Sequence, residues 1–278
     1  MGCANPLIYG FLFARFFPKM KNMLDVERDE QILALLQKKK ACTVYELAQT
    51  LFVSESTIRR DLARMEQKGL VTRTFGGALL KSNPIIEDTS FFLREKESLQ
   101  EKRALVKEAT KYIQSNTAIF VDSSTTCLQM VSLLNDFVNL LIVTNGLVIA
   151  NEIVSKTKHR VSLLGGEVQP STNSVLGTKA ENMAKTYHAS LAIMSTSGVD
   201  LSFGLSEQTE QQAALKNIMR QNSDMTIVLA DAKKIGKKSL AKTCDLKDID
   251  VLITTGALSE AYQTAAPKTK FIHLGFSE

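Results

Sequence analysis

The sequence predicts an α/β protein with a small N-terminal domain of short helices and a hairpin, followed by a larger domain built on a mostly parallel sheet. One observation behind this prediction is a compact series of helix and turn signals between residues 43 and 80. Another is a series of short apolar runs separated by helical patterns, which is typical of buried parallel strands. These runs are residues 118–122, 140–145, 160–164, 190–195, 225–231, 251–255 and 270–274.

The N-terminal series contains the start and stop signals of two short helices. Thr43 and Glu46 have the spacing of a capping box, in which each side chain accepts a backbone N–H of the first turn. After a break, Ser54 can cap a second helix, and Gly69 can end it in the left-handed conformation that glycine adopts easily. The second helix has an apolar face, made of Ile58, Leu62 and Met65.

The opposite face of this second helix carries hydroxyl groups and arginines. These residues are Ser54, Ser56, Thr57, Arg59, Arg60 and Arg64. Arginine can bond guanine through two hydrogen bonds, and serine and threonine can reach phosphates or base edges. A hairpin around Gly76 and Gly77 brings Arg73 near the tip of a wing. We therefore predict a winged helix-turn-helix that binds double-stranded DNA; the alternative is a surface helix with solvated arginines.

The same stretch resembles the N-terminal signature of the DeoR family of bacterial transcription regulators. The matching residues read VSESTIRRDLARMEQKGLVTRTFGGA, and the family pattern is approximately VSxxTIRRDLxxLxxxGxxxRxHGGA. The chain departs from this pattern at Phe75, where the family usually has histidine. The resemblance implies operator DNA as a partner.

Composition adds limits on the function. Residues 23–81 contain 10 Lys and Arg against 8 Asp and Glu, a net charge of +2, so DNA binding depends on where the arginines lie. The four cysteines and three histidines show no disulfide or metal spacing, which predicts reduced thiols, no metal, no cofactor and a cytoplasmic protein. These residues are Cys3, Cys42, Cys127, Cys244, His159, His188 and His273.

Four segments follow from these patterns. Residues 1–22 are an atypical extension whose apolar run is too short to cross a membrane, and Met23 is the expected natural start. The DNA-binding domain takes residues 23–80 and a linker takes residues 81–92, around Pro84. The larger domain takes residues 93–278, and its first element is one long helix over residues 91–113 with Lys102 on the solvated side. A membrane anchor in residues 1–22 is the alternative interpretation.

Polar residues follow several predicted strands, at the edge where ligands bind in open α/β sheets. Ser123, Ser124, Thr125 and Thr126 follow the first strand and suit a phosphate, because their hydroxyls stand beside free backbone N–H groups. A Gly165-Gly166 pair follows the third strand, and Lys234 follows the fifth. These loops predict a phosphorylated small ligand.

The larger domain also resembles the sensor domain of the DeoR family, through segments such as IFVDSSTTCLQMV, LLGGEVQPSTNSVLG and VLADAKKIGKKSLA. The resemblance implies a fold shared with ribose-5-phosphate isomerase and CoA transferases, a sugar-phosphate effector, and a homodimer or homotetramer. It implies these effector-binding residues: Asp122, Ser124, Thr125, Thr126, Gly165, Gly166, Asp200, Glu210, Lys216 and Lys234. Residues 195–200 depart from the family's GANGID stretch, with Ser197 in place of Asn or Asp.

We expect a transcription regulator, a repressor of a sugar-utilisation operon that a phosphorylated sugar releases from its operator. The alternative is an isomerase-like enzyme on sugar phosphates with an appended DNA-binding domain. Since no acid and base pair can be named and Ser197 takes the place of a carboxylate or amide, we expect no catalysis.

Overall fold

A computed structural model describes residues 25–39, 41–67, 69–80 and 91–275. The chain divides into two compact units, Met1–Ile85 and Ile86–Glu278, and each is described by itself. The DNA-binding domain was predicted to end at residue 80, and the first unit ends at Ile85. The predicted extension over residues 1–22 and most of the predicted linker lie outside the described residues.

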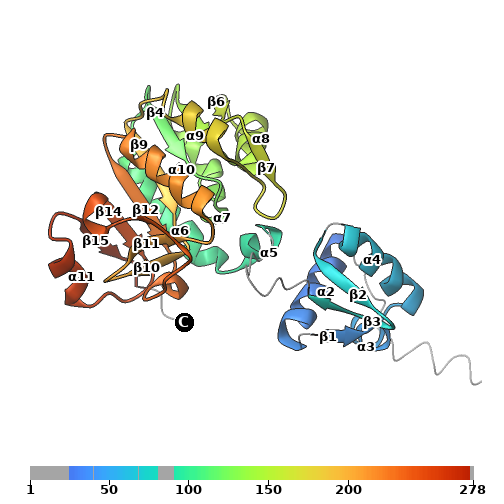
Figure 1. The fold of residues 1–278 in the computed structure, drawn as a ribbon. Helices are drawn as coiled ribbons and strands as arrows, with labels where there is room; N and C mark the ends of the chain where they lie inside the picture. Colours follow the sequence, from blue (N-terminus) through green and yellow to red (C-terminus); the bar gives the residue numbers. More distant parts are fainter. Residues whose placement is uncertain (1–24, 40, 68, 81–90, 276–278) are drawn as a thin grey trace, which may run out of the picture. The chain divides into compact units, whose positions relative to one another are not determined.

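The smaller unit is a winged helix-turn-helix (Figure 1). Its elements are α2 (Asp25–Lys39), β1 (Ala41–Thr43), α3 (Val44–Leu51), α4 (Glu55–Gln67), β2 (Val71–Thr74) and β3 (Gly77–Leu80). The strands form an antiparallel sheet in the order β1-β3-β2, so the predicted hairpin gains a third strand from the segment before α3.

The predicted helix signals of this unit are present. The Thr43–Glu46 capping box starts α3, and the Ser54 hydroxyl accepts the Thr57 N–H at 3.1 Å at the start of α4. Gly69 has a φ of +70° directly after α4. The apolar face of α4 packs into the core together with residues of α2 and α3. Buried residues include Ile32, Leu36, Leu47, Leu51, Ile58, Leu62 and Met65.

The larger unit contains a seven-stranded sheet in the order β15-β14-β12-β9-β4-β5-β6, and every neighbouring pair in it is parallel. All seven predicted apolar runs form its strands. They are β4 (Ala118–Val121), β5 (Leu141–Thr144), β6 (Arg160–Leu163), β9 (Leu191–Ser195), β12 (Thr226–Ala230), β14 (Val251–Thr254) and β15 (Lys270–His273). The strand order reverses between β4 and β9, which places a crevice at the carboxyl ends of these two strands.

Helices cover both faces of this sheet (Figure 1), and an apolar core lies between each layer of helices and the sheet. One face is covered by α6 (Leu99–Ala109), α7 (Thr125–Leu128), the 3₁₀ helix η2 (Val131–Asp136) and α8 (Leu147–Lys156). The other face is covered by α9 (Thr178–Ala184) and α10 (Glu210–Gln221). A third core lies around Leu246, Tyr262 and Leu252, where α11 (Glu260–Ala265) packs.

Two features of the larger unit differ from the prediction. Short antiparallel strands were missed: β7 (Glu167–Gln169) pairs with β8 (Ser174–Leu176), and β10 (Gly198–Asp200), β11 (Gly204–Glu207) and β13 (Ala241–Cys244) form a small sheet. The predicted long helix over residues 91–113 is wrong as a single element. It consists of α5 (Phe91–Lys96), a turn at Ser98 with a φ of +49°, α6, and the 3₁₀ helix η1 (Thr110–Tyr112).

Across the residues that the structure describes, no helix is both long and apolar enough to span a membrane.

Candidate nucleic-acid interface and effector cavity

The exposed face of α4 presents two adjacent arginines. The Arg59 guanidinium lies 2.6 Å from the Glu55 carboxylate one turn before it, and both side chains are exposed. Arg60 is also exposed and makes no hydrogen bond or ion pair to any residue in the described ranges. Ser54 shares its hydroxyl between Ser56 and Thr57, at 2.8 Å from each oxygen. This hydroxyl cluster and the two arginines form a polar surface at the start and middle of α4.

Arg64, predicted to contact DNA, lies elsewhere. Its guanidinium bonds Asp29 of α2 at 2.6 Å and Asp61 at 3.0 Å, and its side chain is only 28% exposed. Asp61 is buried and also accepts from Arg28 at 2.5 Å. The position of Arg64 therefore differs from the prediction: its side chain belongs to an ion-pair network that joins α2 to α4.

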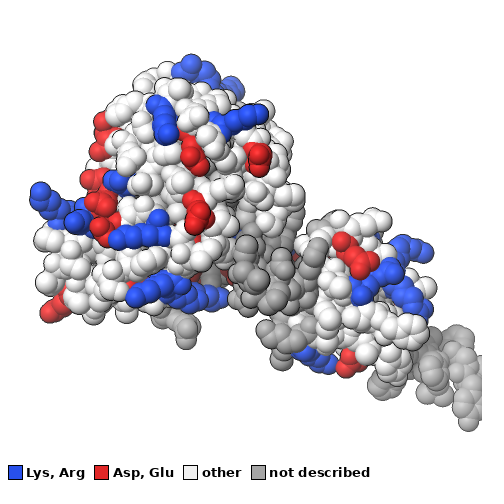
Figure 2. Space-filling view, viewed as in Figure 1, with Lys and Arg blue, Asp and Glu red and all other residues white. Residues whose placement is uncertain are grey.

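The wing places Arg73 beside α4 as well as at the surface. Its backbone N–H donates to Glu66 at 3.0 Å, and its guanidinium lies 3.4 Å from the same carboxylate. Phe75, at the turn between β2 and β3, is fully exposed. Basic and acidic side chains are interspersed on the viewed face of each unit rather than merged into one basic surface (Figure 2).

The larger unit has a cavity of about 240 Å³ at the crevice between the ends of β4 and β9. Its lining comes from α5 and α6, from the loops after β4, β5 and β9, from α10, and from the loop after β12. Lining residues include Arg94, Lys102, Ser123, Ser124, Thr125, Thr126, Asn145, Ser195, Ser197, Glu207, Lys216, Asp231, Lys233, Lys234 and Lys237. The cavity is therefore rich in hydroxyls and ammonium groups.

A buried ion-pair network stands on one side of this cavity. The Lys216 ammonium lies 2.9 Å from Asp122 and 2.6 Å from Glu207, and donates to the Ser195 carbonyl at 2.8 Å. Burial alone would raise the pKa of Asp122, but Lys216 and the hydrogen bond from Ser124 bring this pKa below its usual value. Burial would lower the pKa of Lys216, but the two carboxylates raise it above its usual range. Both members therefore stay charged at neutral pH.

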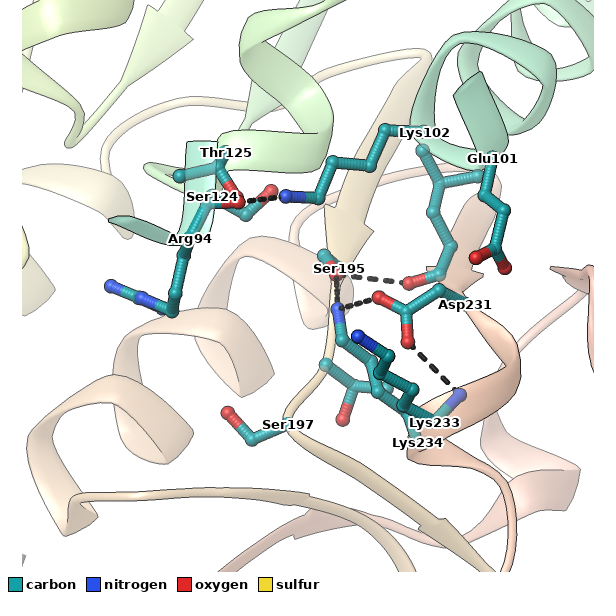
Figure 3. A network of polar contacts seen from close by, with 12 residues as sticks. Arg94, Glu101, Lys102, Ser124, Thr125, Ser195, Ser197, Asp231, Lys233 and Lys234 are labelled. Carbon is teal, nitrogen blue, oxygen red and sulfur yellow. Dashed lines mark hydrogen bonds and ion pairs between the residues drawn. The ribbon is translucent and has the colours of Figure 1, made fainter. Parts of the chain in front are cut away.

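Two further lysines extend into the cavity from α6 and from the 3₁₀ helix η3 (Ala232–Lys234) (Figure 3). The Lys234 ammonium donates to the Ser195 hydroxyl at 2.8 Å and lies 3.5 Å from Asp231. The Lys102 ammonium donates to the Arg94 backbone carbonyl. Burial lowers the pKa of Lys102 to about 8, and the nearby charge of Lys234 acts in the same direction.

Six of the predicted effector residues come together here. Ser124, Thr125, Thr126, Lys216 and Lys234 line the cavity, and Asp122 lies directly behind it, bonded to Lys216. The first-loop hydroxyls are not at the start of a long helix, since α7 has only four residues. Ser124 caps this helix by accepting the Cys127 N–H at 3.1 Å.

The other four predicted effector residues do not line this cavity, and local geometry gives the reason in each case. Asp200 accepts two backbone N–H groups, from Ser202 and Phe203, and so closes the turn between β10 and β11. Glu210 is exposed in the first turn of α10. Gly165 and Gly166 are both exposed, and a Cβ on Gly166 would lie 2.6 Å from the Leu176 carbonyl oxygen.

Sequence reasoning missed several lining residues. Glu207 lies at the end of β11, lines the cavity and pairs with Lys216, whereas the predicted Glu210 lies in the first turn of α10 and does not line the cavity. Lys102 was expected to be solvated, yet its side chain is buried. Arg94 lies in α5 and Lys102 in α6, on either side of the turn at Ser98, and helical periodicity gives no signal for that turn. Among the described residues, no cluster of three metal-ligating side chains is present.

Each of the two units matches a known protein family. The family model of the DeoR-like helix-turn-helix domain matches residues 28–83, and that of the DeoR C terminal sensor domain matches residues 97–256. An uncharacterized HTH-type transcriptional regulator, YulB of Bacillus subtilis, is 35% identical over 86% of this chain and 92% of its own.

Two other relatives have sugar-related names. The lactose phosphotransferase system repressor of Staphylococcus epidermidis is 31% identical over 82% of this chain and 91% of its own. The L-fucose operon activator of Haemophilus influenzae is 31% identical over 85% of this chain and 94% of its own. A solved structure of D-ribose-5-phosphate isomerase with phospho-erythronic acid covers 49% of this chain and 54% of its own, with 15% identity and a TM-score of 0.38.

Proposed function

The chain belongs to the DeoR family of DNA-binding transcription regulators, and from this premise we propose that it represses a sugar-utilisation operon until a phosphorylated sugar binds its sensor unit. The observation that carries the effector proposal is the cavity between β4 and β9, which combines hydroxyls with the ammonium groups of Lys102 and Lys234. Hydroxyls suit a sugar, and ammonium groups suit a phosphate. The lactose-system relative supports repression, while the L-fucose relative is an activator.

On the DNA side, we propose that α4 enters the major groove and that Arg59 and Arg60 reach base edges or phosphates. The DNA phosphates near the start of α4 are contacted by Ser54, Ser56 and Thr57. Arg73 contacts the DNA phosphates from the wing. Arg64 acts differently, by holding α4 against α2 through Asp29 and Asp61. A homodimer or homotetramer would present two α4 helices about 34 Å apart to repeated half-sites. We also propose a cytoplasmic location, because a regulator must reach its operator DNA.

The isomerase alternative finds little support in this cavity. An isomerase needs a positioned base that can take a proton from its substrate. Two buried carboxylates line the cavity, Glu207 and Asp231, and Asp122 lies directly behind it. Asp122 and Glu207 are both paired with Lys216, and Asp231 accepts the Lys233 N–H at 3.2 Å and lies 3.5 Å from the Lys234 ammonium. Since each carboxylate already has a partner, we propose binding without catalysis.

The effector proposal is tested by thermal denaturation of the full chain with a panel of aldose and ketose phosphates and their unphosphorylated sugars. A true effector raises the unfolding midpoint by mass action, and at one hundred times its Kd the stabilisation is about 2.7 kcal/mol. The same compound should release the protein from operator DNA in a gel shift. A Lys234→Ala variant should bind DNA normally and need more effector for release. A panel without any stabilising phosphate, or release by the unphosphorylated sugar alone, would contradict the proposal.

A further inference from the structure

We propose that Lys102 of α6 and Arg94 of α5 hold the anionic group of the effector, so that α5 acts as a clasp over the bound molecule. This inference rests on the proposed function and deepens it. It names the position of the anion in the cavity and the element that responds when the anion arrives. Five lysines line the cavity, and the starting observation is the different state of the three that are not exposed, Lys102, Lys216 and Lys234.

Two of these lysines already have carboxylate partners. Lys216 is bonded to Asp122 and Glu207, and Lys234 lies 3.5 Å from Asp231. Lys102 differs, because its side chain is 4% exposed and no carboxylate in the described part of the chain lies within ion-pair distance of its ammonium. Its hydrogen bond goes to a backbone carbonyl, that of Arg94. A buried cation is normally paired, so this position has the chemistry of an anion site.

The groups around Lys102 also favour an arriving anion. Those that act on its charge are Arg94 of α5, Glu97 in the turn after α5, and Asp231 and Lys234 in the loop after β12. The cations lower the pKa of Lys102 together with its burial, and the two acids only partly oppose them. A phosphate beside Lys102 would reverse this balance and keep the ammonium charged. The charged form makes the stronger hydrogen bond to the Arg94 carbonyl.

The hydrogen bond from Lys102 to the Arg94 carbonyl is one of the contacts that hold α5 to the rest of the sensor unit. At its start, Phe91 is buried and its N–H donates to the Ser171 carbonyl at 2.9 Å. Toward its end, the Arg94 carbonyl accepts from Lys102 and from the Thr125 hydroxyl at 3.4 Å. Ser98 then turns the chain with a positive φ, which brings α6 and Lys102 back to α5. An anion held by Lys102, Thr125 and the Arg94 side chain would therefore fasten α5 to the sensor unit.

This clasp has a direct consequence for signalling. Along the chain, α5 is the first described element after residues 81–90, which connect it to the DNA-binding unit. An effector that fastens α5 therefore acts on the first described element of the sensor unit after that segment.

The first test measures anion binding to the full chain with inorganic phosphate as the probe, by thermal denaturation at matched ionic strength. Lys102→Met keeps the length of the buried side chain and removes its charge, and we expect phosphate binding to weaken about tenfold or more. The matched control is Lys107→Gln, an exposed residue of the same helix that does not line the cavity. We expect this control to bind phosphate like the wild type. Equal phosphate affinity of Lys102→Met and wild type would overturn the assignment.

The second test uses pH, because a merely structural lysine would not couple phosphate binding to a proton. Phosphate is a dianion from pH 8 to 9.5, whereas unliganded Lys102 loses most of its charge across this range, given its pKa of about 8. Wild-type affinity for phosphate should fall by about tenfold over the range. Lys102→Arg should remove this decline, since arginine stays charged. An identical decline in Lys102→Arg would contradict the proposal.

The third test follows α5 by hydrogen exchange of a peptide covering residues 91–98. Saturating phosphate should slow exchange in the wild type and leave it unchanged in Lys102→Met. If phosphate binds and residues 91–98 exchange at the unliganded rate, the clasp is wrong while the repressor proposal stands. If a sugar phosphate releases operator DNA but phosphate binding does not depend on Lys102, the assigned position of the anion is wrong. The proposal that the protein is an effector-released repressor would still stand.

Discussion

Arg60 and Arg64 lie one turn apart on α4 and have different surroundings. Arg60 is exposed, with no partner in the described part of the chain, whereas Arg64 joins Asp29 and the buried Asp61. At the residue scale this difference separates DNA contact from domain stability. A pattern of arginines on a helix does not reveal it, because the acidic partner Asp29 lies on another helix, 35 residues away in sequence.

We expect Arg60→Ala to abolish operator binding and to leave the unfolding midpoint unchanged. Arg64→Ala should lower the stability of the DNA-binding unit by about 1–3 kcal/mol, because Asp29 and the buried Asp61 each lose one ion pair. Gel shifts and urea denaturation followed by circular dichroism measure the two effects. Operator binding by Arg60→Ala at wild-type affinity would refute the groove assignment for α4. A fully stable Arg64→Ala would refute the structural role of its ion pairs.

The ion pair between Lys216 and Asp122 should make the free energy of unfolding depend on pH. The lowered pKa of Asp122 contributes stability that is present above the unfolded pKa and is lost as pH falls through the folded pKa. The raised pKa of Lys216 contributes stability below its unfolded pKa, lost only at high pH. Both contributions are therefore complete at neutral pH. Lys216→Met leaves two buried carboxylates without a cation and should cost about 3–5 kcal/mol at pH 7.

The same variant should lose less stability at pH 5 than at pH 7, because without Lys216 burial raises the pKa of Asp122 and this carboxyl group protonates more readily. Urea denaturation at the two pH values measures the difference. Lys242→Met is a control, since this lysine pairs with Asp245 at the surface and its loss should change little. An equal loss for Lys216→Met at both pH values would show that the carboxylates find other partners.

At the scale of elements, the strands were predictable and the turns were less so. Buried parallel strands need continuous apolar runs, and all seven runs form the main sheet. The strands of the small sheet are three or four residues long, and one of them contains Ser206 and Glu207, so hydrophobicity gives little signal there. The bend at Ser98 was also missed, because a serine with positive φ is set by tertiary contacts.

At Gly77 the backbones of β1 and β3 lie very close together, so the stability of the wing should depend on this glycine. It pairs with Thr43 across β1 and β3, and a Cβ there would lie 2.3 Å from the Cys42 carbonyl oxygen. Gly77→Ala should cost roughly 1–3 kcal/mol and weaken operator binding through the wing. Gly69→Ala, where no heavy atom lies within 4 Å, carries only the conformational cost of a positive φ, about 1 kcal/mol. Thermal midpoints measure both, and a smaller loss for Gly77→Ala than for Gly69→Ala would contradict the packing argument.

At the scale of the whole molecule, the sequence predicted two units and the side of the sheet that holds the site. The carboxyl ends of parallel strands lie at one edge, so the loops after β4 and β12 were expected to meet. The strand order, with its reversal between β4 and β9, was not readable from the sequence, and it decides which loops actually meet. The glycine loop after β6 lies two strands from β4, at the edge of the sheet, which is why Gly165 and Gly166 do not line the cavity.

Two units in one chain must influence each other equally in both directions if the effector releases the operator. Linkage requires that the factor by which a sugar phosphate weakens operator binding equals the factor by which operator DNA weakens sugar-phosphate binding. Couplings of this kind typically amount to about 5- to 150-fold. We expect both factors to fall in this range for the full chain, and Lys234→Ala to weaken effector binding with and without operator alike.

Fluorescence anisotropy of labelled operator with and without saturating sugar phosphate gives one factor, and calorimetric titration of the sugar phosphate with and without operator gives the other. A factor of one would mean that sugar-phosphate binding does not change the affinity for operator DNA. The sensor unit would then have no role in release. A sugar phosphate that tightens operator binding would make the effector a co-regulator retained on DNA. That result would contradict the release of a repressor by its effector.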